Sequence, residues 1–174
     1  MAENIAHVAM NTLLWEAAVM LLVIGFVEMG IGKNEPRDFG IVLLSGAIME
    51  TIAMAFVISA GDIFGATVAA AFILLLWFLG IALILGGTNR IAINHTVWFT
   101  GVVFLGFTMF TLQHGLMTLS VAFGLLAPMC WLLSAANYTG IRILGKIAGA
   151  LSFIDAWVFF AMAFANATGM FTLP

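Results

Sequence analysis

Four carboxylic acids interrupt the long apolar stretches of this 174-residue chain. Glu50 and Asp155 each fall well inside such a stretch, whereas Glu16 and Glu28 fall nearer the two ends of the first one. An acid at the centre of a membrane helix costs about 2.5–3.5 kcal/mol. We therefore interpret Glu50 and Asp155 as candidates for a polar pathway or a proton relay. The alternative is that both are protonated and hydrogen-bond to a neighbouring helix as structural links.

Two tryptophans occupy matching places in the chain. Gly86 follows Trp77 at the same distance as Gly140 follows Trp131. We call the separation of Trp77 from Trp131 the repeat interval. Repeats are common in transport folds, where the pathway lies between the repeated units. We therefore interpret Trp131, Trp77 and the adjacent Phe78 as further candidate residues of a substrate pathway.

The same shift reaches a third unit. One further repeat interval towards the N-terminus, Val23 occupies the tryptophan position and Gly32 occupies the glycine position of a helix end. Three hairpins, each about one repeat interval long, then account for the whole chain. We expect a fold of three pseudo-repeated helical hairpins.

The elements that must position these residues are membrane-spanning helices. The chain is 64% hydrophobic and 7% charged, whereas soluble domains carry about 25% charged residues. So much apolar surface has to face lipid, and each apolar run is long enough to cross a hydrocarbon layer of about 30 Å. The sequence predicts an all-α integral membrane protein with a single transmembrane domain over residues 1–174. Its six expected helices cover about 13–31, 39–60, 64–85, 91–112, 116–136 and 147–168.

The basic residues predict the direction of these helices. There are five of them, and all lie in or beside the first, third and fifth connections: Lys33, Arg37, Arg90, Arg142 and Lys146. Connections rich in Lys and Arg stay in the cytoplasm. We expect a multi-pass protein of the cytoplasmic (inner) membrane with both termini outside the cytoplasm. There is no basic tract, so we expect no nucleic-acid partner.

The sequence shows no motif for metal binding, cofactor binding or catalysis. His7, His95 and His114 are far apart and lack the spacing of metal ligands. The sequence contains no Gly-rich phosphate loop, haem pair, cysteine cluster or nucleophile motif. We expect no metal site, no cofactor and no enzymatic activity.

The segment after Trp131 resembles a known family. The Trp131-Leu132 pair is followed by Leu-Gly-Lys at 144–146 and then by an apolar run from Leu151 that ends in Asp155. This order is similar to that of the urea channel and amide transporter family (AmiS/UreI). The helix count, the outward termini and the pseudo-threefold hairpins are also similar to that family.

The resemblance implies a fold, an assembly and two site residues. It implies a hexameric ring in which each protomer has its own pore. Trp131 would stand at a pore constriction, and Asp155 would stand where the family has a pore-facing Glu. Ala127 occupies a place where the urea channel has a second Trp, so the substrate need not be the same.

A second family is similar in plan. Acetate/succinate uptake transporters share the six-helix hexameric plan, and the segment Gly46, Glu50 and Phe64-Gly65 resembles their second and third helices. Their motif before the first helix is replaced here by residues 10–15.

Charge favours the first of these functions. A pathway lined by acids repels an anion, whereas a neutral amide can donate hydrogen bonds to a carboxylate. The sequence therefore predicts a channel or facilitative transporter for small neutral amides such as urea, formamide or acetamide. The alternatives are a proton-linked transporter of acetate or another short monocarboxylate, and an accessory membrane subunit that transports nothing.

Overall fold

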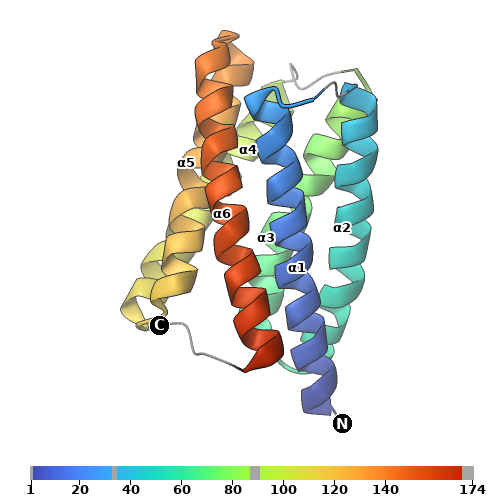
Figure 1. The fold of residues 1–174 in the computed structure, drawn as a ribbon, viewed down its shortest axis with the longest axis vertical. Helices are drawn as coiled ribbons and strands as arrows, with labels where there is room; N and C mark the ends of the chain where they lie inside the picture. The colour runs from blue at the N-terminus through green and yellow to red at the C-terminus, as the bar shows by residue number, and fades with distance from the viewer. Residues whose placement is uncertain (1, 33–34, 87–90, 170–174) are drawn as a thin grey trace.

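Six α-helices make up nearly all of the structure. The computed structural model describes residues 2–32, 35–86 and 91–169, with side chains from His7 onward. Each helix in these ranges is long and apolar enough to cross a membrane, as the sequence predicts. The protein is therefore a multi-pass membrane protein with an all-helical fold. The helices are α1 (Ala2–Met29), α2 (Pro36–Ser59), α3 (Ile63–Ile84), α4 (Ile91–Gln113), α5 (Met117–Thr139) and α6 (Arg142–Thr168) (Figure 1).

Two helices begin five or more residues earlier than predicted. α1 begins at Ala2 rather than near residue 13, and α6 begins at Arg142 rather than near residue 147. A search for apolar runs stops at polar residues, but a helix can continue past them where the side chains reach water or the headgroup region. Only Ile141 separates the start of α6 from the left-handed Gly140 that ends α5.

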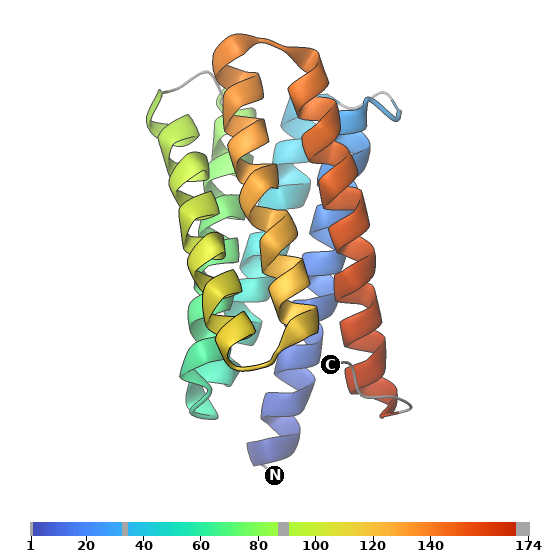
Figure 2. The ribbon, with the colours of Figure 1, turned by 90° about the vertical axis from the view of Figure 1, so that its left-hand side faces the viewer.

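The helices form a closed ring. Each helix packs against its two neighbours in the chain, and α6 packs against α1 to close the ring. The start of α1 and the end of α6 lie at the same end of the bundle as the α2–α3 and α4–α5 turns (Figures 1 and 2). We call this the terminal end. We call the opposite end the basic end, because Arg37, Arg142 and Lys146 lie at the helix starts there; Lys33 and Arg90 lie outside the described residues.

Glycines at helix ends confirm the repeat. Two sets of three glycines have positive φ angles, a conformation that favours glycine because it lacks a Cβ. Within each set, successive glycines are separated by the repeat interval, so each helix is followed within three residues by a repeat-related glycine; Gly30, directly after α1, also has a positive φ but belongs to neither set. The sets are Gly32, Gly86 and Gly140 at the basic end, and Gly61, Gly115 and Gly169 at the terminal end.

The packing of the ring follows the same repeat. The most extensive helix contacts are α2·α3, α4·α5 and α6·α1, which join the second helix of one hairpin to the first helix of the next. Small residues let α2 and α3 approach closely: a Cβ added to Gly80 would lie 2.9 Å from the Gly40 oxygen. Ser134 lies one repeat interval after Gly80, and its hydroxyl donates to the oxygen of Asn94 at 3.0 Å. The repeat therefore sets both the turns and the crossing points.

Candidate functional site

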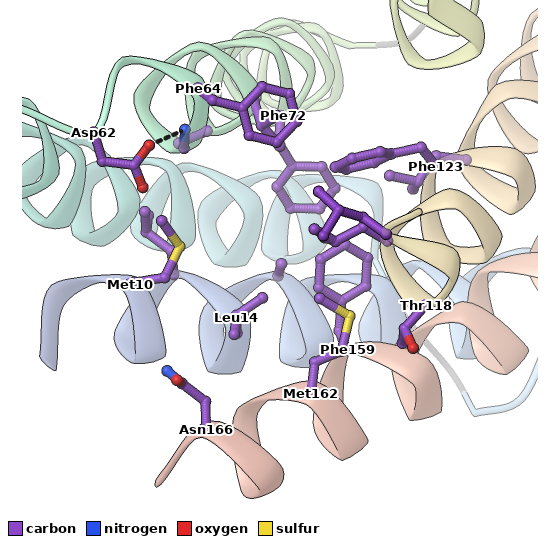
Figure 3. Close-up of a pocket in the computed structure, with 18 of the residues that line it drawn as sticks. Met10, Leu14, Asp62, Phe64, Phe72, Thr118, Phe123, Phe159, Met162 and Asn166 are labelled. Atoms are coloured by element: carbon purple, nitrogen blue, oxygen red, sulfur yellow. Dashed lines mark hydrogen bonds between the residues drawn. The ribbon is translucent and has the colours of Figure 1, made fainter. Parts of the chain in front are cut away.

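A cavity of about 610 Å³ lies within the ring at its terminal end. All six helices contribute to its wall, and the lining reaches the turns at that end (Figure 3). Its volume falls within the roughly 300–1,000 Å³ of small-molecule sites. The wall is mostly apolar, with only a few polar side chains.

The mouth of the cavity carries repeat-related residues. Met10, Phe64 and Thr118 are separated by the repeat interval, and all three line the cavity. The Asp62 carboxylate accepts a hydrogen bond from the Gly65 N–H at 2.8 Å and so caps the start of α3. Asp62 therefore places a negative charge at the mouth.

A ring of side chains forms the floor of the cavity. Each of the helices α2 to α6 has one lining residue that lies deepest, closest to the basic end. In every case this residue is nine positions from the helix end at the cavity mouth, which is about 13–14 Å along the helix axis. These five side chains are therefore at a similar depth. We call them the floor ring: Glu50, Phe72, Phe104, Leu126 and Phe159.

Glu50 is the polar member of the floor ring. Its side chain is 1% exposed, and neither carboxyl oxygen has a hydrogen-bond partner within the described part of the chain. Another acid, Glu16 of α1, lies within electrostatic range of it. Buried carboxyl groups are normally hydrogen-bonded or paired with a cation. Glu50 is therefore free to bind a solute in the cavity.

Phenylalanine rings surround this level of the bundle. Phe104 and Phe123 are stacked, with ring centroids 6.3 Å apart and planes 12° apart. Phe72 lies 6.5 Å from Phe104 at a tilted angle. Figure 3 shows Phe72, Phe123 and Phe159 around the same hollow. The cavity therefore combines one free carboxyl group with aromatic walls.

Asp155 lies deeper than the floor ring. It is four residues farther from the mouth than Phe159, is 0% exposed and does not line the cavity. Its two oxygens also have no hydrogen-bond partner among the described residues, and it interacts electrostatically with the buried Cys130 thiol of α5. In the repeat, Asp155 corresponds to Gly101 and Ala47, which are both buried.

Trp131 packs between α4 and α5. Its indole N–H donates to the backbone oxygen of Trp98 at 3.1 Å. A Cβ added to Gly101 would lie 2.6 Å from Trp131 Nε1, so the indole lies directly against that glycine. Trp131 does not line the cavity. In this structure it occupies a helix interface.

The other two predicted residues also lie outside the cavity lining. Trp77 is partly buried and packs against the apolar core of the bundle. Phe78 is 38% exposed and faces the outside of the ring. Of the five predicted pathway residues, Glu50 alone is a cavity-lining residue.

The floor-ring phenylalanines were missed because they carry no polar atom and are common in membrane helices. Phe72, Phe104 and Phe159 share a depth, nine residues from a helix end, but depth alone does not tell which side of the helix a residue faces. The repeat supplies a second signal, because Glu50 and Phe104 are separated by the repeat interval.

Comparison with protein-family models, with curated proteins and with solved structures finds no match to this chain.

Proposed function

We propose that this protein is a channel or facilitative transporter for small neutral amides such as urea, formamide or acetamide. The observation that carries the proposal is Glu50, a buried carboxyl group without a partner among the described residues, on the floor of a cavity that all six helices surround. Glu50 is the deepest polar side chain of the cavity lining that a solute entering from the mouth would meet.

Amide chemistry fits this point. Each N–H of urea can donate a hydrogen bond to a carboxyl oxygen of Glu50, and neither oxygen has a partner among the described residues. The flat face of an amide can pack against the phenyl rings of Phe72, Phe104 and Phe159. These contacts with the cavity wall thereby replace part of the hydration that the solute loses on entering.

Charge opposes the acetate alternative. Glu50 and Asp62 line the cavity and Glu16 acts on Glu50, whereas none of the described lining residues is Lys, Arg or His. An anion would therefore find no cationic partner in the described lining, at a depth where water stabilises it weakly.

The proposal includes an orientation and an assembly. The three described basic residues of the basic end support a cytoplasmic location for that end. The cavity would then open outside the cytoplasm, in the cytoplasmic (inner) membrane. By the resemblance to the amide transporter family, the protein would form a homohexamer with one pathway per protomer. The resemblance also implies pathway roles for Trp131 and Asp155, although neither side chain lines the cavity in this structure.

Stopped-flow light scattering of proteoliposomes tests the proposal. Vesicles with the protein should take up urea or acetamide faster than empty vesicles, and Glu50→Gln should slow this about tenfold because it replaces one acceptor oxygen by an NH₂ group of similar size. Glu35→Gln, an exposed change at the start of α2, should leave the rate unchanged.

Two other outcomes identify the alternatives. Uptake of labelled acetate together with protons, without urea or acetamide, would identify a carboxylate transporter. No uptake of either solute by a correctly assembled protein would identify an accessory membrane subunit. Each of these results overturns the amide proposal.

A further inference from the structure

The cavity is larger and more aromatic than an amide requires. Urea has four non-hydrogen atoms, whereas a cavity of about 610 Å³ is in the range that holds drug-sized molecules. Four phenylalanines line it near the floor: Phe72, Phe104, Phe123 and Phe159. These features point to a second class of ligand.

Aromatic rings and a carboxyl group together recognise organic cations. A cation within about 6 Å of an aromatic ring face is attracted by the ring quadrupole, and aromatic cages for quaternary ammonium groups are built in this way. Here the stacked pair Phe104 and Phe123, with Phe72 beside it, lines the same hollow as the free carboxyl of Glu50.

The electrostatics of the cavity favour a positive ligand. A buried carboxylate is unfavourable unless it is paired, and within the described residues nothing pairs with Glu50. The acid within electrostatic range of it, Glu16 of α1, supplies no positive charge. A cation in the cavity would supply the missing partner for an ionised Glu50, while Asp62 at the mouth would attract it.

We infer that the cavity binds monovalent organic cations with short apolar substituents, such as quaternary ammonium ions, with the charged centre held between Glu50 and the phenyl rings. This binding does not depend on whether amides pass through the protein. A bound cation would occupy the floor ring, so it would also block any solute that uses the cavity.

Isothermal titration calorimetry in a non-ionic detergent measures this directly. The probes are tetraethylammonium, choline and 3,3-dimethyl-1-butanol, which has the shape of choline without its charge. We expect both cations to bind and the neutral alcohol to bind at least tenfold more weakly. Equal binding of choline and the alcohol would overturn the inference.

Matched variants locate the site. Glu50→Gln should weaken tetraethylammonium binding tenfold or more, and Phe159→Leu should weaken it severalfold because it keeps an apolar side chain but removes the ring. Glu28→Gln changes an acid of α1 that does not line the cavity and should have no effect. Unaltered binding by the Glu50 variant, with an elution volume and melting temperature like those of the parent, would place the cation elsewhere and refute the site.

A flux measurement separates this inference from the proposed function. If tetraethylammonium binds and the vesicles take up no amide, the cation site stands and the amide proposal fails. If amides pass and no cation binds, the reverse holds.

Discussion

Glu50 and Asp155 are both fully buried acids without a hydrogen-bond partner among the described residues, yet they lie in different surroundings. Glu50 is part of the cavity wall, among phenylalanines that leave space beside it. Asp155 lies below the cavity floor, at a position where the other two repeats have Gly101 and Ala47. Burial of an acid is therefore not enough to assign it to a pathway, because the space around it decides what it can bind.

The repeat offers a reason for the position of Asp155. At the α4–α5 interface the large Trp131 packs against the small Gly101. In the α6–α1 pair the equivalent positions hold the smaller Val23 and the larger Asp155. The larger side chain therefore belongs to the second of the two helices, α5, in one pair and to the first, α6, in the other.

The largest effect should come from overfilling the contact between Gly101 and Trp131. Gly101→Leu would drive a side chain into Trp131 and the Ala127 backbone oxygen, which a Cβ alone already approaches to 2.9 Å. Overpacking of this kind costs about 1–3 kcal/mol or more, so we expect a sharply lower melting temperature or no folded protein. The yield and thermal unfolding of the purified variant measure this.

A matched glycine on the same helix serves as the control. Gly106 is exposed, and a Cβ there would meet nothing within 4 Å. Gly106→Leu should keep or slightly raise stability, since leucine is the better helix former. If both variants unfold alike, the packing of Trp131 on Gly101 is not the cause.

The next largest effect concerns the cavity. Glu50→Leu should reduce amide permeability by more than tenfold, because it removes the only polar side chain of the floor ring and leaves a similar volume. It should not lower the melting temperature, since a buried acid without a partner is replaced by an apolar group. Stopped-flow permeability and thermal unfolding of the same preparation test both parts; a fall in stability would show that Glu50 holds the helices together instead.

A smaller effect is expected at Asp155. Asp155→Ala introduces the residue that the repeat has at position 47, so we expect normal assembly and a free energy of unfolding equal to or about 1–3 kcal/mol above that of the parent. Permeability should change less than with Glu50→Leu. Lost flux from an intact oligomer would instead place Asp155 in the pathway, and loss of the oligomer itself would identify a structural link.

The smallest effect should be seen at Ser134. Its hydrogen bond to the Asn94 oxygen replaces the direct backbone approach of Gly40 and Gly80 in the preceding repeat. Ser134→Ala should cost about 0.5–1.5 kcal/mol of stability without changing permeability. Ser45→Ala, which removes only a bond to its own helix at Ile41, should cost less in the same unfolding assay.

The sequence predicts the helices well because their signals are local. Apolar length marks all six spans, and the glycines at 32, 86 and 140 mark one set of ends, which the structure confirms as positive-φ residues. Hydropathy predicts the start of α1 too late, because residues 2–12 are helical without being uniformly apolar. Helix ends at polar segments cannot be read from hydropathy alone.

The site was predicted only in part, for a geometric reason. Glu50 stands out in the sequence because an acid is costly in a membrane, and the structure places it on the cavity. Whether a side chain faces the cavity or a neighbouring helix depends on rotation about the helix axis. Composition does not specify this rotation, so Trp131 and Phe159 could not be sorted into interface and cavity before the ring was known.

The ring closes without a covalent link between α6 and α1. These two helices pack as extensively as α2·α3 and α4·α5, which a short turn joins, and His7 Nε2 lies 3.1 Å from the Asn166 oxygen across the join. Packing alone therefore holds α6 against α1, as a turn and packing together hold the other two pairs. A circular permutant, with a linker between the termini and new ends at the 60–62 turn, should assemble the same bundle and the same cavity.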